Sequence, residues 1–115
     1  MRVTTLIALR NALPGETFQA YQKLAAVDKA FIDNLEAREG LNPAQLMRVI
    51  EAFSKGISQD KIKFIARREY SEQQMHEAIE ACAEGCSIQE LSSFYMPDRF
   101  AADMHSEITR RVRRR

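Results

Sequence analysis

The chain has 115 residues, of which 45% are hydrophobic and 29% charged, and its formal net charge is +1. This length fits one ordinary domain and excludes a large catalytic cleft between two domains. No apolar run approaches the roughly 18 residues that span a bilayer, and the first residues do not resemble a cleavable leader. We therefore expect a soluble, cytoplasmic protein with no membrane partner.

The first 40 residues predict two helices. Residues 4–13 space their leucines and isoleucine as a helix does, although the stretch VTTLIAL could also form a strand. Because no second strand is found to pair with it, helix is the better prediction. Residues 17–38 predict a longer helix with one broad apolar face, which Gly40 ends.

An internal repeat follows. The segment QLMRVIEAFSKGIS, residues 45–58, aligns without gaps with QMHEAIEACAEGCS, residues 74–87, and six of the 14 positions are identical. A third copy starts with DMHSEITRRVRRR at residue 103. A repeat of this kind predicts one supersecondary unit per copy, stacked on its neighbours.

Each copy opens with a predicted helix. A cap residue, Asn42 in one copy and Ser71 in the next, is followed three positions later by a glutamine, which is the pattern of a capping box. The helix is expected to end at Gly56 or Gly85, because glycine readily adopts the left-handed conformation of a helix C-cap.

A second helix is predicted directly after this glycine. Ser58 and Ser87 are its expected N-caps. It is expected to run to about Arg68 in the first copy and about Tyr95 in the second, before Pro97.

These elements predict a single all-α domain over residues 1–115. An N-terminal helical segment, residues 1–40, packs on two and a half helix-pair repeats of 29 residues within residues 41–112, and residues 110–115 form a basic tail. Such arrays offer long surfaces for partners rather than pockets for chemistry.

Cys82, Cys86, His76 and His105 are residue types that bind zinc. In the repeat register, however, the two cysteines fall at positions that are apolar in the first copy, so we expect buried thiols, no metal and no cofactor. The chain also lacks a Gly-rich phosphate loop, a nucleophile elbow and a His-Glu-x-x-His motif. It is therefore not expected to be an enzyme.

Charge is segregated along the chain. Residues 71–97 hold five glutamates and no Lys or Arg, and Glu77, Glu80 and Glu84 share one helical face. We expect this face to be solvated, or to dock on a basic partner such as a host protein.

Basic residues gather in residues 61–68 and in the last six positions. Guanidinium and ammonium groups neutralise phosphates, with an affinity that falls steeply as salt rises. Alternatively, arginines at the end of a last helix favour its macrodipole and keep the protein soluble. The candidate contacts with nucleic acid or a partner are Lys61, Lys63, Arg67, Arg68, Arg99, Arg110, Arg111, Arg113, Arg114 and Arg115.

Residues 84–114 also resemble the helix-turn-helix of sigma-factor and response-regulator DNA-binding domains. In that interpretation Arg99, Ala102, Asp103 and Ser106 would face the major groove. The turn lacks the usual glycine and the second helix carries acidic residues, which phosphates repel. The Gly-x-Ser opening also occurs in the first copy, so the repeat accounts for it without DNA.

A second resemblance covers residues 41–112. The pattern carried by Tyr70, Ser71, Gln74, Met75, Ile79 and Gly85 is similar to short helical repeats in proteins of Firmicutes phages and mobile elements. The resemblance implies an accessory, non-enzymatic role, such as inhibition of a host defence nucleoprotein like a CRISPR effector.

The leading hypothesis is a small binding protein that engages nucleic acid or a nucleoprotein complex through its basic residues. The alternatives are an anti-CRISPR type of inhibitor, which binds a host defence nuclease through the acidic face, and a helix-turn-helix regulator. A homodimer also stays open, because the last unit would leave an apolar edge around Met104 and Ile108.

Overall fold

The computed structural model of the chain describes residue 11 and residues 30–111. Within these residues every regular element is a helix and none is a strand, so the predicted all-α class is confirmed. The helices are residues 30–39, α3 (Pro43–Ser54), α4 (Gln59–Ile65), α5 (Glu72–Ala83), α6 (Ile88–Ser92) and α7 (Ala101–Arg111). Apart from residue 11, which is helical, the helix predicted over residues 4–13 lies outside the described residues, as does the first part of the helix predicted over 17–38.

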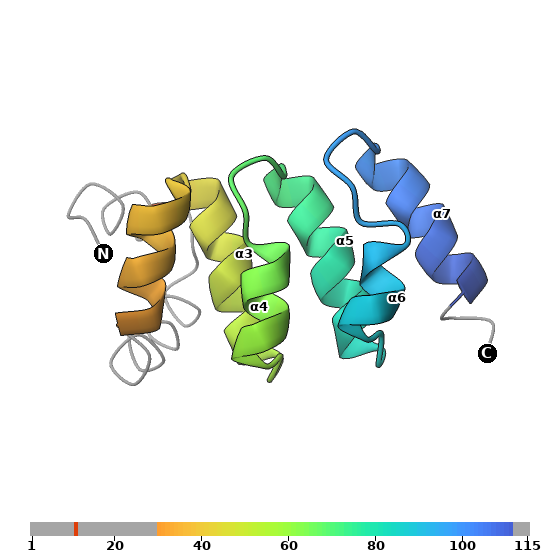
Figure 1. Ribbon diagram of the computed structural model, residues 1–115, viewed down its shortest axis with the longest axis horizontal. Coiled ribbons are helices and arrows are strands. Elements are labelled where there is room, and N and C mark those ends of the chain that lie inside the picture. The colour runs from red at the N-terminus through yellow and green to blue at the C-terminus, as the bar shows by residue number, and fades with distance from the viewer. Residues whose placement is uncertain (1–10, 12–29, 112–115) are drawn as a thin grey trace.

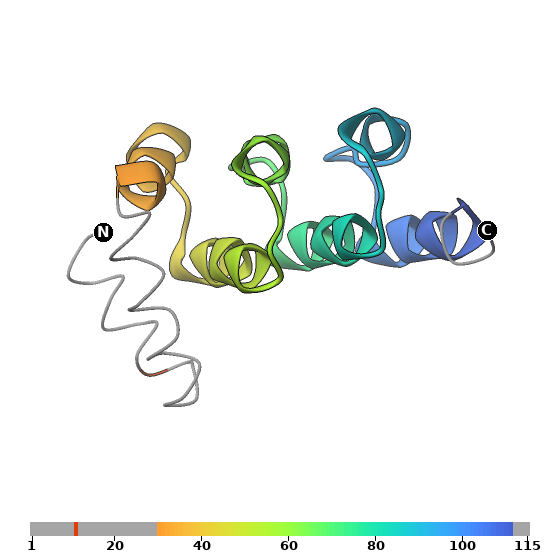
Figure 2. The ribbon, with the colours of Figure 1, turned by 90° about the horizontal axis from the view of Figure 1, so that it is seen from below.

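The helices form two rows (Figure 1). Figure 2 shows α3, α5 and α7 side by side in one row, and residues 30–39, α4 and α6 in the other. Contacts join α3 to α5, α5 to α7, and α4 to α5. No helix in the described part of the chain is both long and apolar enough to span a membrane.

One hydrophobic core joins the helices of the two rows. Leu46, Met75 and Met104 take the same register position on α3, α5 and α7, and all three are 0% exposed. Ile108 is also fully buried. The apolar edge expected around Met104 and Ile108 is therefore absent, because both side chains point into the core.

The helix caps follow the 29-residue register. The side chain of Asn42 caps α3 and that of Ser71 caps α5, each in a capping box with the glutamine three residues later. The turns after these helices contain Gly56 at φ +74° and Gly85 at φ +98°, a backbone conformation that side chains with a Cβ rarely adopt. The caps and turns predicted from sequence are thus present, while the count of two and a half repeat units stays a prediction.

Two buried glutamines tie each first-row helix to the loop that leads into the next one. The amide nitrogen of Gln45 donates to the carbonyl of Tyr70 at 2.7 Å and, at 3.4 Å, to the carbonyl two residues earlier. The amide of Gln74 repeats this one copy later, with Arg99 at 2.6 Å and the carbonyl two residues earlier at 3.1 Å. These bonds fix how the loop lies against the helix.

The second-row helices are shorter than expected. α4 ends at Ile65 rather than about Arg68, and α6 ends at Ser92 rather than about Tyr95. The Tyr95 hydroxyl donates to the Ile65 carbonyl at 2.6 Å, and its ring stacks on that of Tyr70 at 3.9 Å. This tertiary bond replaces the one that a continued α4 would have made, so the chain can leave the helix there.

We expect Gln74→Leu to lower the free energy of unfolding by about 1–3 kcal/mol, because two loop carbonyls lose their donor while the side-chain volume is nearly kept. Urea denaturation measures this change. Gln73→Leu, one residue earlier on the exposed side of α5, is the matched control and should change stability much less. Equal effects of the two substitutions would show that the amide bonds do not stabilise the fold.

Candidate functional site

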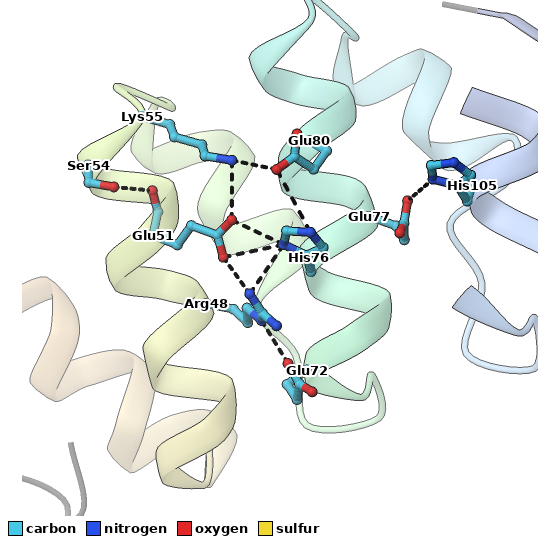
Figure 3. A network of polar contacts seen from close by, with 9 residues as sticks. All are labelled: Arg48, Glu51, Ser54, Lys55, Glu72, His76, Glu77, Glu80 and His105. Carbon is cyan, nitrogen blue, oxygen red and sulfur yellow. Dashed lines mark hydrogen bonds and ion pairs between the residues drawn. The ribbon is translucent and has the colours of Figure 1, made fainter. Parts of the chain in front are cut away.

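A polar network joins α3 to α5 on the surface of the first row (Figure 3). The Lys55 ammonium bridges the carboxylates of Glu51 at 3.2 Å and Glu80 at 2.6 Å. Arg48 adds a second bridge, with Glu51 at 2.8 Å and Glu72 at 2.7 Å. Each cation therefore binds one carboxylate of its own helix and one of the neighbouring helix.

The pKa values of the network follow from these contacts. Burial alone would raise the pKa of Glu51, but hydrogen bonds from Arg48 and Lys55 outweigh it and lower that pKa. The hydrogen bond from Lys55 lowers the pKa of Glu80, and the bond to Glu80 raises the pKa of Lys55. All these directions favour the charged forms, so the network is a set of ion pairs at neutral pH.

Glu51, His76 and Glu80 also offer ligand atoms that all lie within 4.8 Å of one another. Imidazole and carboxylate are ligand types for zinc. A metal ion would nevertheless have to displace two cations, because Lys55 bridges the two carboxylates and Arg48 Nη1 lies 3.2 Å from His76 Nδ1. Sequence reasoning missed this cluster, since its members come from two copies 25 residues apart.

The predicted acidic face is partly neutralised within the chain. Glu77 pairs with Nδ1 of His105 on α7 at 3.0 Å, and Glu80 pairs with Lys55 on α3. Glu84 lies exposed beyond the end of α5. A basic partner would have to compete with these in-chain contacts for the carboxylates of Glu77 and Glu80.

Arg67, one of the predicted basic contacts, has an internal role. Its guanidinium carbon lies 5.0 Å from the ring centroids of both Phe64 and Tyr70. It also donates to the Phe64 carbonyl at 3.0 Å and to the Tyr70 hydroxyl at 3.2 Å. Arg67 therefore packs against the turn after α4, while its side chain stays 35% exposed.

The two arginines of the basic tail that the structure describes also form contacts within the chain. Arg110 and Arg111 both bind the Glu107 carboxylate, at 2.6 and 2.8 Å, and Arg111 donates to the Ser93 hydroxyl at 2.6 Å. The hydrogen bond from Arg110 lowers the pKa of Glu107. Arg113, Arg114 and Arg115 lie outside the described residues.

The repeat register explains this cluster on α7. The outer face of α7 carries charge at four positions where α3 and α5 have glutamine or apolar side chains, nearly all of them buried. The four charged residues are Asp103, Glu107, Arg110 and Arg111. A helix with these residues does not offer a further unit the apolar face that α3 and α5 offer, and polar outer faces of this kind keep helical arrays soluble.

The remaining predicted cations are Lys61, Lys63, Arg68 and Arg99. In the described part of the chain no carboxylate lies within ion-pair distance of any of them. The same holds for Arg38, on the helix of residues 30–39, which sequence reasoning missed. Arg38 does not belong to a basic cluster in the sequence, because Glu36 and Glu39 stand on either side of it.

The two cysteines are buried thiols that form no disulfide with each other, as expected. Burial raises the pKa of the Cys82 thiol to about 11. Because the thiolate is the reactive form, this thiol is a poor nucleophile at neutral pH.

The region that resembles a helix-turn-helix has a long connection. The eight residues 93–100 separate α6 from α7, whereas the turn of that motif has three or four. Ala102, Asp103 and Ser106 are exposed on α7, and Arg99 is half-buried before it. In a helix-turn-helix the two helices beside the turn, here α6 and α7, would pack on each other, whereas α7 packs mainly on α5.

Comparison with protein-family models, with characterised proteins and with solved structures found no match to this chain. The contacts and charges of its own residues are therefore what bears on its function.

We expect Lys55→Met to reduce stability by about 1 kcal/mol at pH 7, since Lys55 holds two partly exposed carboxylates. The pKa values of Glu51 and Glu80 are lowered by folding, so their stabilising effect is present above the unfolded value of about 4.3 and is lost as pH falls below it. The difference between wild type and variant should therefore narrow from pH 7 to pH 3 in urea titrations. A gap that stays constant with pH would contradict the ion-pair assignment, and Lys61→Met serves as the control.

Replacing the charged outer face of α7 should promote self-association. In the combined variant Asp103→Gln, Glu107→Ala and Arg110→Ala, three of the four charged positions of α7 take the residues of α5, and α7 can pack on another copy. Size-exclusion chromatography with light scattering should then show a larger mass than for wild type, while the exposed control Ser106→Ala should leave the mass unchanged. An unchanged mass for the combined variant would show that these charges do not prevent stacking.

Proposed function

We propose that this protein is a small binding module for nucleic acid, either free or within a nucleoprotein complex. One observation carries the proposal: the cations of the two rows differ in how they are neutralised. Arg48 and Lys55 of the first row each bind two carboxylates. Lys61 and Lys63 of the second row have no carboxylate within ion-pair distance in the described residues.

Unneutralised cations are the ones that can exchange their counterions for phosphates. When a cation already holds a carboxylate, binding a phosphate requires that pair to break, and little is gained. A cation in water releases counterions from the nucleic acid when it binds, and this release supplies most of the sequence-independent affinity. The second row and its turns are therefore the side of the molecule that suits a polyanion.

The basic segment around α4 keeps a positive balance. Lys61, Lys63 and Arg68 lie within eight residues, and Arg68 is exposed in the turn after α4. Asp60 precedes them on the same helix, and Glu69 pairs with Arg67 at 3.8 Å. The three cations thus exceed the one carboxylate of this segment, Asp60, that has no basic partner within ion-pair distance in the described residues.

The test is binding of fluorescein-labelled DNA and RNA, measured by anisotropy over a series of salt concentrations. We expect wild type to bind at low salt, with an affinity that falls as salt rises. The triple variant Lys61→Gln, Lys63→Gln and Arg68→Gln should bind more weakly and reduce the slope of log K against log salt by about 2–3, which is about one per lost phosphate contact.

A matched pair of single variants separates specific from general charge effects. Lys63→Gln and Lys55→Gln each remove one ammonium group, but only Lys63 lacks a carboxylate partner among the described residues. We expect Lys63→Gln to weaken binding and Lys55→Gln to leave it nearly unchanged. No binding by wild type at low salt, or equal losses for both variants, would reject the proposal.

A further inference from the structure

A small cleft lies between the helix of residues 30–39 and α4. Its volume is about 120 Å³. It is lined by Phe31, Asn34, Leu35, Arg38, Glu39 and Lys63. One of the unneutralised cations of each helix thus reaches the same cleft, although Arg38 and Lys63 are 25 positions apart in the sequence.

The lining of the cleft suits an anion with several acceptor oxygens. Arg38 brings a planar guanidinium with up to five N–H donors, Lys63 an ammonium with three, and Asn34 an amide with two. Neither cation has a carboxylate within ion-pair distance in the described residues, while Glu39 adds one negative charge to the lining. The cleft therefore has one positive charge in excess and more donors than its own acceptors use.

Apolar side chains on one side of the cleft position the ammonium group of Lys63. Leu35 is buried, and the Phe31 ring packs edge-on against Phe53 at a centroid distance of 5.5 Å. The Lys63 ammonium lies 5.8 Å from the Phe31 ring centroid, so the ring holds it at the cleft. Asn34, Arg38 and Lys63 are all exposed, so an anion can reach them from solvent.

The size of the cleft limits what it can hold. Pockets that bury a whole small-molecule ligand have volumes of roughly 300–1,000 Å³. At about 120 Å³, this cleft has room for one tetrahedral group but not for a sugar and base in addition. Arg and Lys together are well suited to such a group, because the guanidinium fork binds two oxygens and the ammonium a third.

We infer that this cleft binds one backbone phosphate of the nucleic acid, held by Arg38 and Lys63 with Asn34 as an additional donor. The inference rests on the proposed function and extends it. It assigns a role to Arg38 and says where on the protein one phosphate of the nucleic acid binds. Lys61 and Arg68 then supply contacts outside the cleft.

The first experiment compares Arg38→Gln, Lys63→Gln and the double variant in the anisotropy assay. Each single variant should weaken DNA binding about 5- to 10-fold and lower the salt slope by about 1. Because both side chains hold the same phosphate, the double variant should lose less than the product of the two single losses. Arg68→Gln combined with Arg38→Gln is the control pair and should show independent effects.

The second experiment uses inorganic phosphate alone. Phosphate, compared with chloride at equal ionic strength, should shift the NMR signals of the Asn34 side-chain amide in wild type but not in Arg38→Gln. The shift shows that the cleft takes the phosphate group itself, and the DNA assay shows that it takes this group from a nucleic acid. Circular dichroism checks that each variant is folded.

The outcomes separate the inference from the proposed function. If DNA binds wild type and Arg38→Gln equally while Lys61→Gln and Arg68→Gln weaken it, the cleft is not a phosphate site and the proposed function stands. If wild type binds no nucleic acid at low salt, both are rejected. If polyglutamate displaces the DNA as well as unlabelled DNA of the same charge does, the cleft does not distinguish phosphates from carboxylates and the inference is overturned.

Discussion

The bond from a buried glutamine amide to the loop before the next first-row helix is the constraint on which this fold depends. Gln45 and Gln74 each donate to two loop carbonyls, and the same side chains close the capping boxes of α3 and α5. One residue type thus starts a helix and positions the loop that follows it. In α7 the equivalent residue is Asp103, whose carboxylate cannot donate.

The position of the loops decides which charges meet. With α3, α5 and α7 aligned in one row, Arg48 and Lys55 reach carboxylates of α5 that are 24 and 25 positions away in sequence, respectively. The second row has no such arrangement around Lys61 and Lys63 in the residues that the structure describes. The contrast between the rows, rather than the net charge of +1, is what suggests a side for an anionic partner.

Sequence reasoning found what depends on neighbouring residues. The caps at Asn42 and Ser71, the turn glycines and the buried thiols are all local, or follow from the register of two copies. It missed the end of α4, where the Tyr95 hydroxyl binds the Ile65 carbonyl from 30 positions away. It also missed a local contact, because Arg67 lies against the rings of Phe64 and Tyr70, each three positions away in sequence. A count of charges along the chain shows neither effect.

The polar contacts between α3 and α5 differ from those between α5 and α7, although the helices are arranged in the same way. His76 on α5 and His105 on α7 stand at equivalent positions and face the preceding helix 28 residues back. There His76 meets the guanidinium of Arg48, with Glu51 beside it, whereas His105 meets the carboxylate of Glu77. Because Ile50, Ile79 and Ile108 keep one inner position of the register buried in all three helices, the packing tolerates this change of sign. Surface positions of the array can therefore adapt to a partner while the core and the caps keep the fold, which is how a small helical array can specialise without a cavity for chemistry.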